Sequence, residues 1–573
     1  MMNTNRFIKS LFISFLVASP LWVQAQEEYG TNDGDISDAE VVIQKDRQLA
    51  LPLANRYFDK MDKTVRERSD KPISYDLKLL NYDLPEMNPP INPARIHHQK
   101  AENLYGNYLK AGFGNYITPY LEGFFNSRQN DRMDYGVRFK HLSSGEGAVY
   151  KDLSASSLNQ LDLFGTVYQG SDKISAYIGH TRRVVHYYGF DEPVEEVNKD
   201  DIRKMTNLLT FGGAYNIVRS RNDFEVTPRL DGYIFSDNFD ATEYNFELSA
   251  TGKYKLNKDN SLSLDVGAVL NQAKQSLTEN EQSVELKNSR NILYVSPSFN
   301  GKADAFTYSV GVRFAYSSDS TELDKNIYIY PNLHAYYNID EGKLGAFVDI
   351  EGNLERVTLR SLNEENPYIG QLQQLVHADK LVDLTAGFDF IPISNVSVRG
   401  SAGYALIKNL GFFVNNWEDV SRFDVVYNDE TTGNFHIGLE GSARFRELTA
   451  SLSSQLNAYS VSDELQEPWH RPTMINKLSV NYQYLEKLTL GTNLIHYGGI
   501  KAKAFEPDEF GIVQETTTKL KPIFDLSLHA DYSITDHLGA FLQLQNLFGQ
   551  NYERYLNYKA RGIQFMAGAS YSF

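Results

Sequence analysis

The chain contains no cysteine at any of its 573 positions. This absence excludes disulfide bonds, thiolate metal sites and a lipid anchor attached through cysteine. Positive charge is also scarce, since 56 Lys and Arg residues stand against 73 Asp and Glu residues and leave a formal net charge of −17. Such a balance argues against nucleic-acid binding, which needs a basic face. Beyond the first 25 residues there is no apolar run of about 18 residues, so no transmembrane helix is expected there.

The first 25 residues have the organisation of a secretory signal peptide. Arg6 and Lys9 form a basic segment, residues 11–23 are mostly apolar, and Val23-Gln24-Ala25 offers small residues for cleavage. The apolar stretch is shorter than the roughly 20 residues that a membrane-spanning helix needs. We therefore expect residues 1–25 to be removed and the mature chain to begin at Gln26.

Residues 26–103 precede the long periodic part of the sequence. Pro85, Pro89, Pro90 and Pro93 exclude a helix or a central strand around them, because proline lacks a backbone donor and fixes φ. The segment is either an extended strap that fills the lumen of the following domain or a periplasmic leader. No feature of the sequence separates these two alternatives.

From residue 104 to 573 the apolar residues recur at every second position. The clearest example is the apolar set between 244 and 256, which alternates with polar residues and consists of Tyr244, Phe246, Leu248, Ala250, Tyr254 and Leu256. Successive side chains of a strand point to opposite faces, so each strand has one apolar and one polar face. The strands run about 9 to 14 residues, as tilted membrane-spanning strands do, whereas strands of soluble sandwiches are shorter.

Short polar turns alternate with other, mostly long, connections. Ten short turns are placed at 130–131, 170–172, 221–223, 257–260, 301–304, 340–342, 392–395, 446–447, 485–487 and 535–537. The long connections include 142–157, 189–203, 272–289, 360–381, 409–431, 461–472, 498–519 and 549–561. This alternation predicts an all-β fold, a transmembrane antiparallel β-barrel of about 22 strands in a Gram-negative outer membrane, with turns in the periplasm and loops outside.

The last strand carries a candidate membrane-assembly signal. Gly568, Tyr571 and Phe573 place aromatic residues at the last and third-last positions, with glycine three before the inner aromatic. This arrangement resembles the signal read by the barrel assembly machinery, which we expect as a partner during biogenesis. Met566 departs from the pattern, because a polar residue is usual at that position.

The C-terminal 38 residues, 536–573, resemble the end of TonB-dependent receptors. The resemblance is carried by Asn546-Leu547-Phe548 before the last loop, by Asn551-Tyr552-Glu553 and by the final aromatic strand. The Tyr-rich strands are similar to those of such barrels from Bacteroidota. The resemblance implies transport of a bulky solute across the outer membrane. Members of that family carry an N-terminal plug domain, for which residues 26–103 are short, so coupling to TonB is not implied.

No constellation of catalytic residues is recognisable. The 12 histidines are scattered, and neither HExxH nor a suitably placed GxSxG occurs. We therefore predict no enzyme, no metal site and no cofactor. An acidic stretch is interpreted as a solvated charged surface, because it lacks the spacing of a calcium loop, and consists of Asp191, Glu192, Glu195, Glu196, Asp200 and Asp201.

Candidate recognition residues are the aromatic side chains of the predicted loops, Phe412, Phe413, Trp417 and Trp469. Exposed aromatic residues anchor many interfaces and sugar sites. Tyr187 and Tyr188, near a strand end, are expected instead in the aromatic girdle at the membrane interface, and for Trp417 and Trp469 the girdle and a recognition role are equally favoured. Expected partners are outer-membrane lipid and lipopolysaccharide, with an outer-membrane protein or lipoprotein as a further candidate. The alternative to transport is a barrel subunit or scaffold of a multi-protein assembly or export machine.

Overall fold

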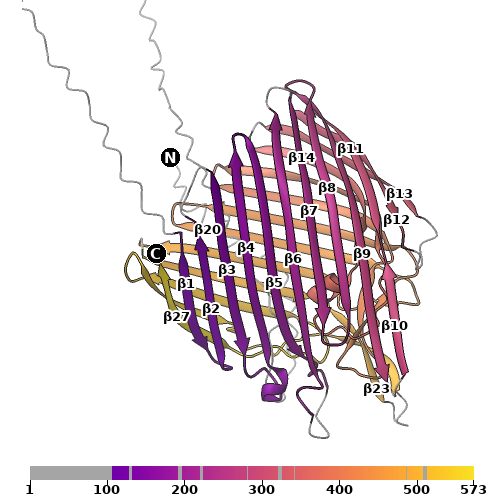
Figure 1. Ribbon diagram of the computed structural model, residues 1–573, viewed down its shortest axis with the longest axis vertical. Coiled ribbons are helices and arrows are strands. Elements are labelled where there is room, and N and C mark those ends of the chain that lie inside the picture. The colour runs from indigo at the N-terminus through magenta and orange to yellow at the C-terminus, as the bar shows by residue number, and fades with distance from the viewer. Residues whose placement is uncertain are drawn as a thin grey trace, which may run out of the picture. The chain divides into compact units, whose positions relative to one another are not determined.

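The computed structural model describes residues 106–127, 132–190, 197–219, 223–279, 282–319, 326–340, 342–485, 487–507 and 513–573. The expected signal peptide 1–25, the segment 26–103 and the acidic residues 191–196 lie outside these ranges. Within them, a large β-barrel accounts for most of the chain (Figure 1).

The barrel wall is built from strands in chain order. Its first half contains β1 (Tyr108–Gly114), β2 (Thr118–Asn126), β3 (Met133–Ser144), β4 (Ser156–Gln169), β5 (Asp172–His186), β6 (Arg203–Arg219), β7 (Phe224–Asp237), β8 (Thr242–Lys255), β9 (Asn260–Glu279), β10 (Gln282–Ser289) and β11 (Ile292–Ala303). Its second half contains β12 (Phe306–Ser317), β13 (Ile327–Asp340), β14 (Leu344–Glu355), β15 (Ala378–Ile393), β16 (Val396–Lys408), β19 (Thr432–Arg444), β20 (Leu448–Ser460), β21 (Met474–Tyr484), β22 (Leu488–Gly498), β25 (Ile523–Ser533), β26 (Leu538–Gln545) and β27 (Gln564–Ser572).

Four strands and two helical segments lie in the connections. The strands form two separate hairpins, β17 (Gly411–Asn415) with β18 (Phe423–Tyr427) and β23 (Lys501–Pro507) with β24 (Val513–Lys519). The helical segments are the 3-10 turn η1 (Lys151–Ser154) and α2 (Leu359–Glu365), whose first turn is capped by Thr358 and Ser361. Among the residues that the structure describes, no helix is long and apolar enough to cross a membrane.

The wall has 22 strands, as the alternation of turns and loops predicts. The sheet contains 23 named strands, but β10 and β11 both pair with β9, along different parts of its length. They therefore form one wall strand that is interrupted at Arg290 and Asn291, and 23 minus one gives 22. All neighbours pair antiparallel, and β1 pairs with β27 to close the ring.

The outer face of the wall is apolar and the inner face is polar. On β8 the side chains of Tyr244, Phe246 and Leu248 are 55%, 41% and 54% exposed. Glu243 and Glu247 alternate with them and point inward, where Glu247 pairs with Arg356 from the end of β14. So much exposed apolar surface is stable only against lipid, which is the arrangement of a membrane barrel. The period-two prediction is confirmed.

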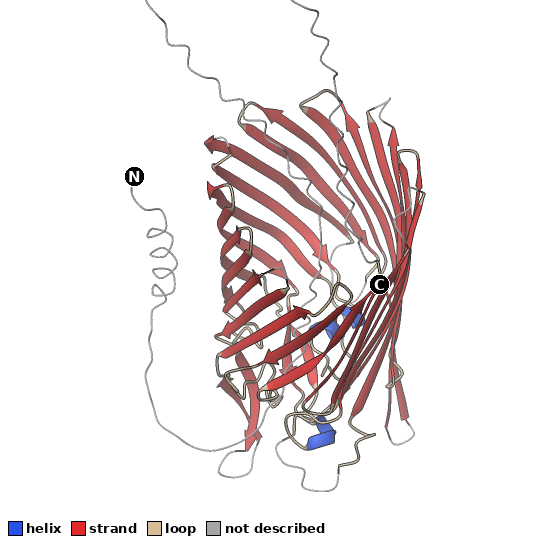
Figure 2. Cartoon of the chain, turned by 90° about the vertical axis from the view of Figure 1, so that its left-hand side faces the viewer, coloured by secondary structure: helices blue, strands red, loops and turns tan. Residues whose placement is uncertain are grey.

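The two ends of the barrel carry different connections (Figure 1, Figure 2). The predicted short turns at 170–172, 257–260, 301–304, 392–395, 446–447 and 535–537 fall at strand junctions of one end, where Gly170 and Gly342 have φ of 63° and 74°, values that glycine adopts without strain. The predicted turn 130–131 and parts of the turns 221–223, 340–342 and 485–487 lie outside the described residues. Most connections at the other end are long, and include 145–155, 187–202, 356–377, 409–431, 461–473, 499–522 and 546–563. The predicted alternation is confirmed, except that the predicted long connection 272–289 is wrong, because it consists of the paired ends of β9 and β10. β1 starts and β27 ends at the short-turn end.

The seam between the first and last strands needs glycine on both sides. Gly112 lies opposite Gly568, and a Cβ atom built on Gly568 would be 2.0 Å from the Ala111 carbonyl oxygen and 2.6 Å from the Phe541 ring. Tyr571 and Phe573, the other residues of the predicted assembly signal, are exposed on the outer face. Their role in assembly stays a prediction.

Replacing Gly568 with valine is expected to prevent closure of the ring, because the new side chain overlaps the β1 backbone. The measurement is the fraction of chain that migrates as a compact, heat-modifiable species on a denaturing gel. Ala569→Val is the matched control, since Ala569 is on the outer face of the same strand and should fold normally. Equal folded fractions for the two variants would refute this account of the seam.

Candidate functional site: a loop cap over one mouth of the barrel

Five long connections pack together at one end of the barrel, and we call their described residues the loop cap: 187–190 with 197–202, 356–377, 409–431, 461–473 and 546–563. Figure 2 shows loops and a helical segment inside the outline of the wall. Tyr187 follows β5, whereas Ile369 lies between β14 and β15, and the two residues hydrogen-bond to each other. Loops from distant parts of the ring therefore meet over this mouth.

The loop cap has an apolar core of its own. It joins the wall residues Tyr233, Phe235 and Ala273 to buried side chains from four loops, which are Tyr187, Tyr188, Leu359, Leu362, Tyr368, Ile369, Leu375, Phe413, Phe423, Val425, Tyr555 and Tyr558. The aromatic rings meet edge to face, as in the pairs Tyr188–Tyr558 at 4.8 Å and Phe423–Tyr555 at 5.5 Å between centroids. Burial of this many large side chains is the main source of stability for the cap.

Buried tyrosine hydroxyls link the loops through backbone carbonyls. Tyr187 donates to Ile369 at 2.8 Å, Tyr555 donates to Glu365 at 2.5 Å, and Tyr558 donates to Ser421. Burial raises the pKa of Tyr555 to about 12 and the pKa of Tyr558 well above its ordinary value, so both hydroxyls keep their protons. Each bond runs from one loop to another, with two of the carbonyls in 356–377 and the third in 409–431, and satisfies a backbone acceptor that a loop or a helix end otherwise leaves unpaired.

His470 joins four loops. Its Nδ1 lies 2.8 Å from the Phe413 carbonyl and its Nε2 lies 3.2 Å from the Leu556 amide nitrogen, while its own amide donates to Lys501. These partners fix one neutral tautomer, in which Nδ1 donates and Nε2 accepts. Burial lowers the pKa of His470 to about 3, and the Arg554 guanidinium adds to this effect.

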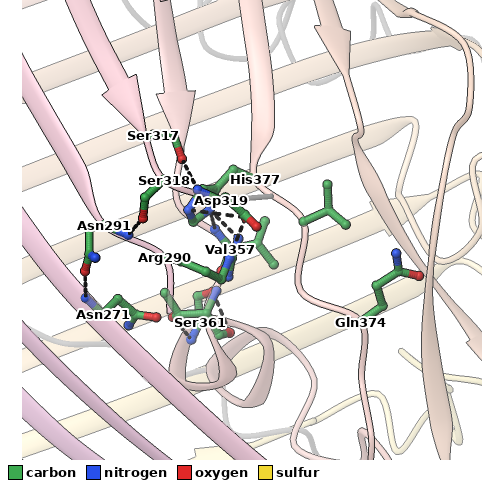
Figure 3. Close-up of polar contacts among 12 residues, drawn as sticks. Asn271, Arg290, Asn291, Ser317, Ser318, Asp319, Val357, Ser361, Gln374 and His377 are labelled. Carbon is green, nitrogen blue, oxygen red and sulfur yellow. Dashed lines mark hydrogen bonds and ion pairs between the residues drawn. The ribbon is translucent and has the colours of Figure 1, made fainter. Parts of the chain in front are cut away.

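A buried polar cluster around Arg290 holds the 356–377 loop against the wall (Figure 3). Arg290 occupies the interruption between β10 and β11, and its Nε lies 2.7 Å from Asp319 Oδ2. Its Nη1 donates to the Val357 carbonyl at 2.5 Å, and its Nη2 lies 2.6 Å from His377 Nδ1. The side chains of Arg290 and Asp319 are 1% and 2% exposed. The ion pair is thus fully desolvated and bonded on both sides.

The same loop docks on the wall at further points, one of which is the Arg360 amide, which donates to Glu243 of β8 at 3.0 Å. Lys204, near the start of β6, donates from Nζ to the Ile369 carbonyl at 2.7 Å. Gln275 on β9 makes two bonds with the backbone of Gln373, at 2.8 Å from Nε2 to the carbonyl and at 2.7 Å from the amide to Oε1. These are hydrogen bonds of side chains, and no strand ladder joins this loop to the wall within the described residues.

Asn546 fixes the conformation of the last loop. Its contacts explain why asparagine begins the Asn546-Leu547-Phe548 segment. Its φ of 46° lies in the left-handed region, which asparagine tolerates better than most residues. The fully buried side-chain amide donates to the carbonyls of Gln550 and Arg561 at 3.1 and 2.8 Å. Phe548 points outward and is exposed. The residue therefore ties both ends of loop 546–563 together where β26 ends.

Replacing Asn546 with alanine is expected to loosen loop 546–563 by about 2 to 3 kcal/mol, because two buried carbonyls lose their donors. The measurement is the rate of trypsin cleavage after Arg554 and Lys559, which should rise by more than tenfold. Asn551→Ala, at an exposed position of the same loop, is the control and should leave the rate unchanged. Equal rates for both variants would contradict the role given to Asn546.

A cavity of about 450 Å³ lies on the lumen side of the wall. Its lining comes from β8, β9, β11, β12 and the end of β14, and includes Asp265, Tyr294 and Arg313. Arg356 crosses over it to pair with Glu247 at 2.9 Å, and Arg313 donates to Asn353 at 2.7 Å. In the part of the chain that is described, no group of three or more His, Asp or Glu side chains is placed to hold a metal ion.

The predicted recognition residues differ in their exposure to solvent. Phe412, Phe413 and Trp469 are buried within the loop cap, whereas Trp417 at the tip of the β17–β18 hairpin is 68% exposed. The first three therefore pack the cap and do not face solvent. The girdle prediction for Tyr187 and Tyr188 is wrong, because both are buried in the cap core.

Sequence reasoning missed the residues that hold the cap, chiefly Arg290, Asp319, His377 and Gln275. They belong to loops or to the polar face of strands, where periodicity carries no information about partners. One signal in the sequence could have indicated the interruption of the wall strand. Two strand-like stretches meet at Arg290-Asn291 without any turn residues between them.

No family model and no curated protein matches the chain. Solved structures do match, among them the FrpB iron transporter from Neisseria meningitidis, with 12% identity and a TM-score of 0.60 over 82% of this chain and 81% of that one. The ferric-catecholate import receptor Fiu from E. coli matches with 9% identity and a TM-score of 0.58, covering 82% of each chain. The ferric enterobactin receptor PfeA from Pseudomonas aeruginosa matches with 12% identity and a TM-score of 0.58, over 82% and 80%. The expected likeness to TonB-dependent receptor barrels is confirmed at the level of the fold.

Proposed function

We propose that this chain is an outer-membrane barrel that carries a bulky solute across the membrane, and that the loop cap is its gate. Export through the signal peptide at 1–25 belongs to the proposal. The three solved structures named above are described as an iron transporter and receptors for ferric complexes, which supports transport as the class of function and leaves the solute of this chain unspecified.

The observation that carries the proposal is the separation between wall and cap. The wall is one continuous ring of backbone hydrogen bonds, closed by β1 and β27. The loop cap has its own core and its own hairpin, β17–β18, and the 356–377 loop docks through side chains such as Gln275 and Lys204. Such an arrangement allows the cap to move while the ring stays intact, which is what a gate requires.

The scaffold alternative is favoured by the dense core of the loop cap, which suits a permanently closed barrel. Trp417 is the contact residue that we propose for a partner or a solute under either function, because its indole is exposed at the cap surface. Lipopolysaccharide and a lipoprotein partner stay predictions. The two functions differ in one respect, which is whether the cap must move.

A covalent cross-link between the loop cap and the wall distinguishes the transport function from the scaffold function. Gln275→Cys combined with Gln373→Cys places two thiols where the native side chain and backbone touch, and the chain has no other cysteine. With the purified full chain in liposomes, we expect swelling by a sugar solute when the pair is reduced and little swelling after a short bis-maleimide joins it. Each single-cysteine variant, treated alike, is the control. Swelling that is absent in the reduced state would exclude transport of that solute class and favour the scaffold.

A further inference from the structure

Three residues on neighbouring strands form a row across the wall beside the 450 Å³ cavity. Asp265 on β9 pairs with Ser296 on β11. The ladder between β11 and β12 then skips Ser296 and Pro297, between the pairs Val295–Phe314 and Ser298–Gly311. The skip has a local cause, since Pro297 has no backbone N–H to donate. Arg313 of β12 faces this gap and lines the cavity together with Asp265.

Asp265 and Arg313 differ from the other charged pair of the cavity. Glu247 and Arg356 neutralise each other at 2.9 Å. Among the described residues, neither Asp265 nor Arg313 forms an ion pair within 4.0 Å. Arg313 donates to the Asn353 side chain at 2.7 Å, and its guanidinium lies over the Tyr294 ring at 5.8 Å. The cavity therefore offers one anion and one cation without ion-pair partners, on strands that are two positions apart.

Unsatisfied polar atoms lie at the same place. Ser296, between the two charges, is 1% exposed, and its Oγ has no hydrogen-bond partner within the described structure. The Nε of Arg313 is likewise buried without a partner. Buried polar atoms are nearly always paired, and the two here can be satisfied by the polar groups of a molecule in the cavity.

We propose that this cavity binds a small zwitterion, a ligand that carries an ammonium group and a carboxylate about the length of a dipeptide apart. Asp265 binds the ammonium group and Arg313 binds the carboxylate, for which its guanidinium is well shaped. Strands are about 4.8 Å apart, so the two backbones are about 10 Å apart. A dipeptide, which spans about 7 Å, reaches between them when its two charged ends meet the side chains. The volume is within the range of small-ligand pockets.

This inference rests on the proposed transport function, because the cavity faces the lumen through which a solute would pass. It adds the class of ligand, which the fold comparison leaves open. Arg313 and Asp265 are here binding residues, and no bond is made or broken.

The test uses calorimetric titration of the full-length mature chain in detergent with three probes. Glycylglycine carries both charges, N-acetylglycine carries only the carboxylate, and glycinamide carries only the ammonium group. Glycylglycine should bind most tightly. Arg313→Gln should weaken glycylglycine and N-acetylglycine about tenfold or more and spare glycinamide, and Asp265→Asn should weaken glycylglycine and glycinamide and spare N-acetylglycine.

Arg138→Gln is the matched control, since Arg138 is a lumen-facing guanidinium on β3, far around the ring from this cavity. It should leave all three affinities unchanged, and the heat-modifiable gel shift verifies that each variant is folded. Glycylglycine that binds no better than the singly charged probes, or binds equally well to both cavity variants, overturns the proposal. Probe-selective binding in a barrel that fails the liposome assay would instead keep the site and remove the transport function.

Discussion

Replacing Arg290 with methionine is expected to release the 356–377 loop from the wall and to open the loop cap. The substitution removes the guanidinium that pairs with the Asp319 carboxylate, which is 2% exposed, and it removes the donors to Val357 and His377. Breaking a buried, hydrogen-bonded ion pair costs about 3 to 5 kcal/mol. Trp469 reports the change, because its indole is 2% exposed in the closed cap. In a Trp417→Phe background, its fluorescence emission should shift to longer wavelength.

Two control variants separate the loss of a buried ion pair from the loss of an exposed one and from the removal of both buried charges. Lys343→Met breaks an exposed pair with Asp340, in which the two side chains are 66% and 59% exposed, and should cost under about 1 kcal/mol. Arg290→Met combined with Asp319→Leu removes both buried charges and should recover much of the loss. An Arg290→Met protein with the emission of the Lys343→Met protein would show that the cluster does not hold the cap.

Acidification is expected to open the loop cap through His470 and His377. In the closed cap His470 accepts from Leu556, and Nδ1 of His377 faces the Arg290 guanidinium, so neither ring can take up a proton there. Burial lowers the pKa of His470 to about 3 and lowers the pKa of His377 as well, whereas an exposed histidine has a pKa near 6.5. The closed state therefore binds fewer protons than the open state.

Acid destabilises the closed state of the loop cap. Because the pKa is lower in the closed state, these histidines favour closure fully above about pH 6.5, and their contribution falls as the pH drops below that value. At pH 5 the loss is about 2 kcal/mol for each histidine, or about 4 kcal/mol for both. The measurement is Trp469 emission between pH 7.5 and 5. His470→Gln and His377→Gln should each reduce the slope of the opening free energy against pH by about one proton. A cap whose stability is independent of pH in this range would contradict the assignment.

The wall could be predicted from the sequence because the residues that determine each strand and each turn lie within that strand or turn. Alternation of residues such as Tyr244, Asn245 and Phe246 decides which side of a strand faces lipid, and turn residues such as Gly170 and Gly342 decide where strands are joined. Together they give the 22 strands and the two kinds of end. The interruption at Arg290 escaped this reasoning because it lacks turn residues, and it is recognisable only when β9 pairs with both β10 and β11.

The loop cap could not be predicted because it depends on which loops meet after the ring has closed. Tyr187 and Tyr188 follow a strand, so a position in the membrane girdle was expected, yet Tyr187 hydrogen-bonds to Ile369 and both pack in the cap core. Phe412, Phe413 and Trp469 are candidate recognition residues because they lie in long loops, yet they are buried. Aromatic residues in a loop indicate burial against a partner, and the sequence does not say that the partner is another loop of the same chain.

The most direct test of the gate is the single-channel conductance of the full chain in a planar bilayer, compared between the native protein and Arg290→Met at neutral pH. If the loop cap closes the mouth, the native barrel is closed most of the time and the variant is open for a much larger fraction of the recording. If the variant stays as closed as the native barrel while Trp469 emission shows that its loops are released, the cap does not close this barrel.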